Sequence, residues 1–84
     1  MNKKIGREAM ILKKRRKEMG MTQTDVAGQV GIQLQQYQLY EYGKRKVSSS
    51  SMLLGLRLCA VLELDPYELI FEKSTDWVKK VRKL

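Results

Sequence analysis

Glutamine and leucine side chains dominate residues 33–39, which read QLQQYQL. A glutamine amide carries a donor and an acceptor side by side, so it can pair with the N6 and N7 edge of adenine. A leucine side chain can contact the methyl group of thymine in the same groove. This segment therefore has the chemistry to read base pairs, although a glutamine-rich helix face is also an ordinary neutral, solvated surface.

Positive charge lies on both sides of this neutral segment. The chain has 17 Lys and Arg against 9 Asp and Glu, which gives a formal net charge of +8. Eight basic residues fall within 1–20, none falls within 21–43, and the next are Lys44, Arg45 and Lys46. Because such a balance favours polyanionic partners, we expect these flanks to contact phosphates. A basic composition that serves only solubility is the alternative.

Residues for catalysis and metal binding are scarce. The chain has no histidine, the commonest general base and metal ligand. Its single cysteine, Cys59, lies in the apolar run LGLRLCAVLEL, so we expect it to be buried. The acids between residues 63 and 72 are interpreted as cap and surface residues. We therefore predict a protein that is not an enzyme and that uses no cofactor and no metal ion.

The length and composition indicate one small helical domain. The chain has 84 residues with 6 glycines and 1 proline, too few turn residues for a small sheet protein. A single cysteine forms no internal disulfide, and no signal peptide or membrane-spanning run is evident. We expect an all-α protein in the cytoplasm, without membrane association.

Two short helices joined by a tight turn are predicted within residues 23–42. Thr22 and Asp25 have the spacing of a capping box, which starts the first helix. Gly31 can take the left-handed conformation that the turn requires. The second helix spans about 33–42 and ends before a glycine. Such a unit usually places its second helix in the DNA major groove.

Four further helices are expected around this pair. The first lies at about 6–19. The second is capped by one of Ser48–Ser51 and runs to about 63, and the third runs from the Asp-Pro pair at 65–66 to about 73. The last lies within the basic, amphipathic tail 73–84. We therefore divide the chain into a domain at 1–72 and a tail at 73–84.

The helix at 33–42 has two faces on a wheel of about 100° per residue. Tyr37, Tyr40 and Glu41 fall on the face that continues the apolar pattern of the preceding helix, so this face should pack. The opposite face is left for a ligand and carries Leu34 at its edge with Gln35, Gln38, Leu39 and Tyr42.

The run MTQTDVAGQVGI…YEYGKRK resembles the helix-turn-helix family of phage Cro and CI-type repressors. The shared features are the T-Q-x-x-[LV]-A-x-x-x-G-[IV] entry and the E-x-G-K-R exit, and the similarity covers about residues 5–71. The resemblance implies a compact five-helix Cro/CI-type fold, to which the amphipathic spacing of the tail adds a short sixth helix. It also implies a sequence-specific, double-stranded-DNA-binding transcriptional regulator of bacterial or phage origin, a repressor more than an activator.

The resemblance also assigns roles by position. Arg16 and Glu41 match a buried ion pair between the first helix and the reading helix; a solvated basic run is the alternative for Arg16. The expected base-reading set is Gln33, Leu34, Gln35, Gln38 and Leu39. The expected phosphate-contacting set is Gln23, Tyr42, Lys44, Arg45 and Lys46, with packing against the next loop as the alternative for Tyr42. The chain departs from the family at Gln33, where a better cap is usual, and in a longer, proline-free loop after Gly43.

One domain of this size covers one half-site, so we expect a homodimer on DNA. Its surface would be the fifth helix and the tail, with Phe71, Trp77 and Val81 as anchors; closing the domain's own core is the equal alternative for Trp77. A second class of function is an antitoxin or adaptor that binds a toxin or effector protein. A third is the controller of a restriction–modification system.

Overall fold

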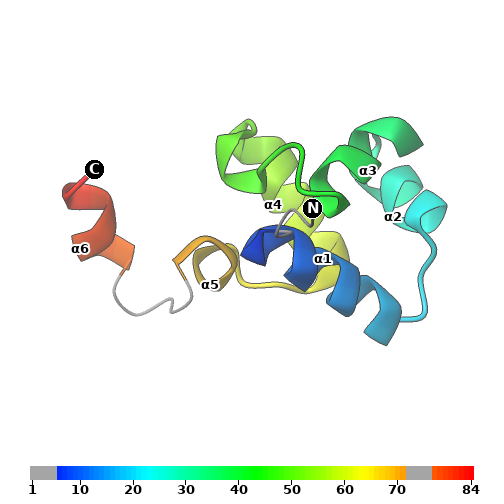
Figure 1. Ribbon diagram of the computed structural model, residues 1–84, viewed down its shortest axis with the longest axis horizontal. Coiled ribbons are helices and arrows are strands. Elements are labelled where there is room, and N and C mark those ends of the chain that lie inside the picture. The colour runs from blue at the N-terminus through cyan, green and yellow to red at the C-terminus, as the bar shows by residue number, and fades with distance from the viewer. Residues whose placement is uncertain (1–5, 72–76) are drawn as a thin grey trace, which may run out of the picture.

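Six α-helices and a short 3₁₀ helix are present in the computed structural model, which describes residues 6–71 and 77–84 and contains no strand within them (Figure 1). The elements are α1 (Arg7–Glu18), α2 (Gln23–Val30), α3 (Leu34–Glu41), the 3₁₀ helix η1 (Val47–Ser49), α4 (Met52–Leu62), α5 (Pro66–Phe71) and α6 (Trp77–Arg82). The all-α prediction is confirmed. The expected end of the fifth helix near residue 73 and the domain boundary after residue 72 lie outside the described residues.

Helices α1 to α5 surround one hydrophobic core, and α6 lies at the far end beside α5 (Figure 1). Helix α3 packs against α1 and α2, while α2 also packs against α4. The core is made of the buried residues Leu12, Val26, Ala27, Val30, Tyr37, Tyr40, Val47, Leu58, Cys59, Leu62 and Leu69. The burial expected for Cys59 is therefore confirmed, and it raises the pKa of that thiol.

The helix starts are fixed by local side-chain caps. Asp25 N–H donates to Thr22 Oγ1 at 3.0 Å and Thr22 N–H donates to Asp25 Oδ2 at 2.8 Å, which confirms the capping box. Ser51 is the serine that caps α4, since its Oγ accepts the Leu54 N–H at 3.2 Å. These bonds satisfy amides that have no partner within their own helices.

The turn between α2 and α3 depends on Gly31. Its φ of 89° lies in the left-handed region, as the sequence predicts. The N–H groups of Gly31 and Ile32 both donate to Ala27 O, at 2.9 and 3.0 Å, and so close the C-terminus of α2. The chain can then start α3 only three residues later, at Leu34.

Two arginines of α1 bind the C-terminal ends of other helices. The Arg7 guanidinium donates to the carbonyl oxygens of Glu68 and Leu69 in α5. Arg15 Nε donates to Leu62 O, at the last residue of α4, over 2.9 Å. A cation is favourable at a helix C-terminus, where carbonyls lack partners. Part of the positive charge on the basic flank therefore serves the fold.

A pair of glycine substitutions separates backbone strain from crowding. At both Gly28 and Gly31, the position that a Cβ would take has no neighbouring atom within 4 Å, so neither Ala would clash. Gly28 lies inside α2, where Ala should stabilise the protein by about 1 kcal/mol. Gly31→Ala should destabilise it by about 1–2 kcal/mol because of the left-handed φ. Urea unfolding of both variants checks this, and equal shifts would contradict it.

Candidate nucleic-acid interface

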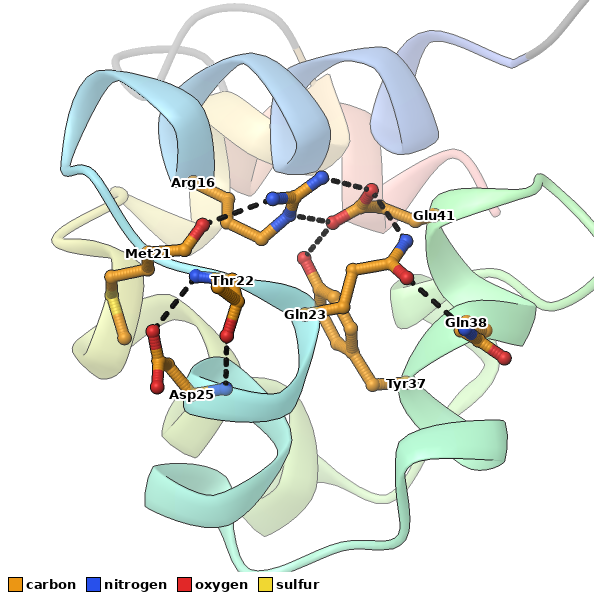
Figure 2. A network of polar contacts seen from close by, with 8 residues as sticks. All are labelled: Arg16, Met21, Thr22, Gln23, Asp25, Tyr37, Gln38 and Glu41. Atoms are coloured by element: carbon orange, nitrogen blue, oxygen red, sulfur yellow. Dashed lines mark hydrogen bonds and ion pairs between the residues drawn. The ribbon is translucent and has the colours of Figure 1, made fainter.

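The inner face of α3 is anchored by a buried ion pair between Arg16 and Glu41, as expected (Figure 2). Arg16 Nε donates to Glu41 Oε2 at 2.6 Å, and its Nη2 donates to Glu41 Oε1 at 3.0 Å. The third nitrogen, Nη1, donates to Met21 O at 2.9 Å. Arg16 is 9% exposed and Glu41 is 2% exposed, so the solvated-run alternative for Arg16 does not hold. The pair joins α1, the turn after it, and α3.

Two tyrosines complete the packed face of α3. Tyr37 and Tyr40 are buried in the core, which confirms the face predicted by the helical wheel. The Tyr37 hydroxyl donates to Glu41 Oε2 at 2.5 Å, so Glu41 receives bonds from both a neighbour on α3 and a residue on α1. Every oxygen of this buried carboxylate thus has a partner, which offsets the cost of removing it from water.

Protonation of this cluster is shifted by burial and by its hydrogen bonds. Burial alone raises the pKa of Glu41, but bonds from Arg16, Tyr37 and Gln23 outweigh it and hold that pKa below its usual value. The hydrogen bond to Glu41 raises the pKa of Arg16. Burial, followed by the contact with Glu41, raises the pKa of Tyr37. At neutral pH the cluster is therefore a guanidinium, a carboxylate and a neutral phenol.

A chain of two glutamines extends from the buried carboxylate toward the surface (Figure 2). Gln23 Nε2 donates to Glu41 Oε1 at 3.1 Å, and Gln38 Nε2 donates to Gln23 Oε1 at 3.0 Å. Because a carboxylate only accepts, it fixes which end of the Gln23 amide points inward. Each amide nitrogen has a second N–H that these two bonds do not use. The predicted phosphate-binding Gln23 and base-reading Gln38 are thus in direct contact.

The outer face of α3 is only partly open. Gln33 and Gln35 are exposed, whereas Leu34, Gln38 and Leu39 are half-buried. Leu34 and Leu39 are therefore less exposed to solvent than leucines on a fully solvated helix face. The base-reading role of these five residues stays a prediction.

The start of α3 is held without a serine or threonine cap. The Gln33 N–H donates to Gln36 Oε1 at 3.1 Å, so the Gln36 side chain turns back to the helix start. Gln36 is thereby occupied with the backbone, although its type alone would have made it a candidate reader. This contact supports the start of α3 at the position where the resemblance leads us to expect a serine or threonine cap.

The loop after α3 is fixed at both ends. Gly43 takes a φ of 77°, and the N–H groups of Lys44 and Arg45 both donate to Leu39 O, at 2.9 and 3.1 Å. Farther along, the Tyr40 hydroxyl and Ser50 Oγ lie 2.6 Å apart. Lys44, Arg45, Lys46 and Tyr42 are all exposed, so the structure leaves the predicted phosphate-contacting side chains of this region open to solvent.

One functional candidate of this region is not evident in the sequence. Glu8, in the first turn of α1, accepts the N–H groups of Val47 and Ser48 in the loop, at 2.8 and 3.4 Å. The only sequence signal for it is an acid within a strongly basic segment. Neither spacing nor periodicity relates it to a loop so distant in the chain.

Membrane-spanning helices and clusters of metal ligands are both absent from the described residues. Within 6–71 and 77–84, no helix has the length and apolar character needed to cross a membrane. The same part of the chain has no group of three or more His, Cys, Asp or Glu side chains that could hold a metal ion.

Comparison with known proteins identifies one family. A family model described as helix-turn-helix matches residues 12–69, well over half of the chain. These residues run from the middle of α1 to α5 and include the whole α2–turn–α3 unit. Neither the curated proteins nor the solved structures that were compared contain a match.

The buried pair gives a prediction for stability. Glu41→Gln leaves the Arg16 guanidinium buried without a counter-charge and should cost about 3–5 kcal/mol of unfolding free energy. Urea unfolding at neutral pH measures the loss. Glu18→Gln is the matched control, because Glu18 is exposed and its ion pairs should be worth less than about 1 kcal/mol.

The same variant gives the sign of the pH dependence. Since the folded-state pKa of Glu41 lies below its unfolded value, the stabilisation is complete above an unfolded-state pKa of roughly 4.3. It is lost as pH falls through the folded-state value. The stability gap between wild type and Glu41→Gln should therefore narrow on acidification, and a gap independent of pH would contradict the assignment.

Proposed function

We propose that this chain, which belongs to the helix-turn-helix family of the Cro/CI type, is a sequence-specific repressor that reads double-stranded DNA with α3. The family makes it a DNA-binding regulator domain. The specificity, the repressor role and the division of contacts described below are the proposal.

The observation that carries this proposal is the contrast between α3 and the loop that follows it. The outer face of α3 carries glutamine amides and half-buried leucines, and it has no lysine or arginine. Lys44, Arg45 and Lys46 follow directly and are exposed. Base pairs are distinguished by amide and apolar contacts in the major groove, whereas affinity comes mainly from neutralised phosphates. We therefore assign discrimination to α3 and affinity to the loop.

Gln23 and Gln38 fit this division through their unused N–H groups. The second N–H of Gln23 can donate to a phosphate while the first stays on Glu41. Gln38 keeps its carbonyl and one N–H for a base edge while it donates to Gln23. The two amides would then connect a backbone contact to a base contact, with orientations set by the buried carboxylate.

Selection of bound sites from random DNA, repeated at two salt concentrations, tests the proposal. It yields the preferred sequence, its symmetry and the number of neutralised phosphates together. A reproducible, symmetric motif is expected. Binding without any sequence preference would contradict the assignment of α3 as a reader.

Two substitutions should separate base reading from phosphate binding. Gln35→Ala should reduce discrimination at one base position by about 1–3 kcal/mol. Lys44→Ala should weaken binding to all sequences alike and lower the salt slope by about 0.9. Fluorescence anisotropy with the selected site, single-base variants of it and random DNA measures both effects.

The matched control for the reading position is Gln29→Ala. Gln29 is an exposed glutamine on α2, so this change removes the same side chain outside the proposed reading face. It should leave the base preference unchanged. If Gln35→Ala and Gln29→Ala have the same effect on specific and random DNA, the reading role of Gln35 is wrong.

The proposed homodimer has a candidate surface in an apolar groove between α4, α5 and α6. The groove has a volume of about 490 Å³, and Met52, Leu56, Ile70 and Val81 are among its lining residues. Met52 is 80% exposed and its neighbour Leu53 is 62% exposed, which is unusual for large apolar side chains on one helix end. A second copy covering this groove would join two half-site readers into one unit with two-fold symmetry.

The anchors predicted for this surface differ in their exposure. Trp77 is half-buried because its ring stacks on Tyr67, with centroids 4.4 Å apart and planes 20° from parallel. Phe71 is also half-buried, and Lys80 Nζ lies 6.0 Å from its ring centroid. Val81 is open to solvent. We therefore assign Trp77 to the contact between α5 and α6, and the dimer contact to the exposed rim of the groove.

A charged substitution in the groove should disrupt the dimer. Leu56→Glu should shift sedimentation toward the monomer and weaken binding to a two-half-site operator far more than binding to one half-site. Met10→Glu is the control, since Met10 is 60% exposed on α1 and does not line the groove. Unchanged sedimentation of Leu56→Glu would place the dimer contact elsewhere.

A further inference from the structure

A carboxylate on α1 holds the loop that carries the proposed phosphate contacts. Glu8 Oε1 accepts the Val47 N–H at 2.8 Å and the Ser48 N–H at 3.4 Å. The first of these bonds joins residues 39 positions apart in the chain. It acts on the first turn of η1, immediately after Lys44, Arg45 and Lys46.

The same loop segment is secured by its neighbours. The Val47 side chain is buried in the core and lies against Gly55, whose Cβ position would be 3.5 Å from Val47 Cγ1. Residues from the start of α1 and from the loop, among them Glu8, Arg45 and Lys46, line a shared cavity of about 200 Å³. Lys44, Arg45 and Lys46 are thus exposed, while the backbone that follows them is bonded to α1.

An anchor matters here because exposed basic side chains are flexible. Fixing one residue's backbone costs about 1–2 kcal/mol of conformational entropy, so a long loop that orders only on DNA would lose affinity. When the loop is already ordered in the free protein, this entropy is lost on folding and does not reduce the affinity for DNA. A single oxygen, Glu8 Oε1, accepts from two loop amides and so reduces the conformations open to the segment before DNA binds.

We infer that Glu8 is a positioning residue for DNA binding, which holds the 44–46 segment in register with α3. The inference rests on the proposed function, because it assumes that this segment contacts phosphates. Simple electrostatics predicts the opposite effect of Glu8: removing an acid raises the net charge from +8 to +9 and should strengthen DNA binding. The sign of the change therefore distinguishes positioning from charge.

Glu8→Ala should weaken binding to the selected operator by about five- to tenfold at 0.1 M salt, and lower the salt slope by about 0.9 for each phosphate that the loop no longer reaches. Glu18→Ala is the matched control, because it removes an exposed acid from the same helix without a loop contact. It should strengthen binding slightly with an unchanged slope. Glu8→Gln keeps an oxygen of the same reach without the charge, so it should restore the wild-type slope.

Hydrogen exchange in the free protein gives a readout that does not involve DNA. The amides of Val47 and Ser48 should exchange faster in Glu8→Ala than in wild type, Glu8→Gln or Glu18→Ala. Circular dichroism establishes that each variant is folded. If Glu8→Ala does not fold, Glu8→Gln alone decides: protected loop amides and a wild-type slope support the inference, and unprotected amides or a lower slope overturn it.

The outcomes separate this inference from the proposed function. If a combined Lys44→Ala, Arg45→Ala and Lys46→Ala variant leaves the salt slope unchanged, the phosphate role of the loop fails, and the positioning role fails with it. If the combined variant lowers the slope but Glu8→Ala behaves like Glu18→Ala, only the positioning role is overturned. If the combined variant and Glu8→Ala both lower the salt slope, adding Glu8→Ala to the combined variant should lower the slope little further.

Discussion

The interaction on which the rest of the structure depends is the buried pair of Arg16 and Glu41. Each charge alone would be costly inside the core, so the two side chains must meet. Their contact brings α1 and α3 together, and the bond from Arg16 to Met21 O adds the turn between α1 and α2. The contacts of one guanidinium therefore join α1, the turn after it and α3. The orientation of α3 follows from this geometry rather than from α3 itself.

The same pair also determines chemistry at the surface. Glu41 accepts bonds only, so it selects the amide nitrogen of Gln23, and the carbonyl of Gln23 then selects the amide nitrogen of Gln38. A carboxylate in the core thereby orients the amide of Gln38 on the outer side of α3. A glutamine with a free amide could rotate to suit several bases, whereas one with a fixed amide discriminates between them. If Gln38 reads a base, as proposed, the ion pair contributes to specificity as well as to stability.

The sequence predicted the features that arise from neighbouring residues. The Thr22–Asp25 capping box and the left-handed Gly31 are local, so spacing alone located them. The inner face of α3 followed from helical periodicity, and the pairing of Arg16 with Glu41 was implied by family resemblance. The choice of Ser51 among four serines depended on the 3₁₀ helix before it, which no periodicity indicates.

Contacts between charged side chains and distant backbone groups could not be predicted from the sequence. The bond from Glu8 to Val47, and those from Arg7 and Arg15 to helix ends, join charged side chains to backbone groups. A backbone amide or carbonyl carries no residue-specific signal, so any polar side chain could have been its partner. The charge count therefore gave no sign that Arg7 and Arg15 bind helix ends, and it left Glu8 without a role.

Under the proposed function, these contacts make α1 part of the DNA-binding unit. If α3 supplies discrimination without charge, affinity must come from cations placed at a fixed distance from it. Long basic side chains reach phosphates in many conformations, so it is the backbone of the loop that sets this distance. That backbone is fixed by Leu39 O on α3 at one end and by Glu8 on α1 at the other. Since the ion pair joins α1 to α3, the two anchors are held relative to each other, and the loop backbone is held with them.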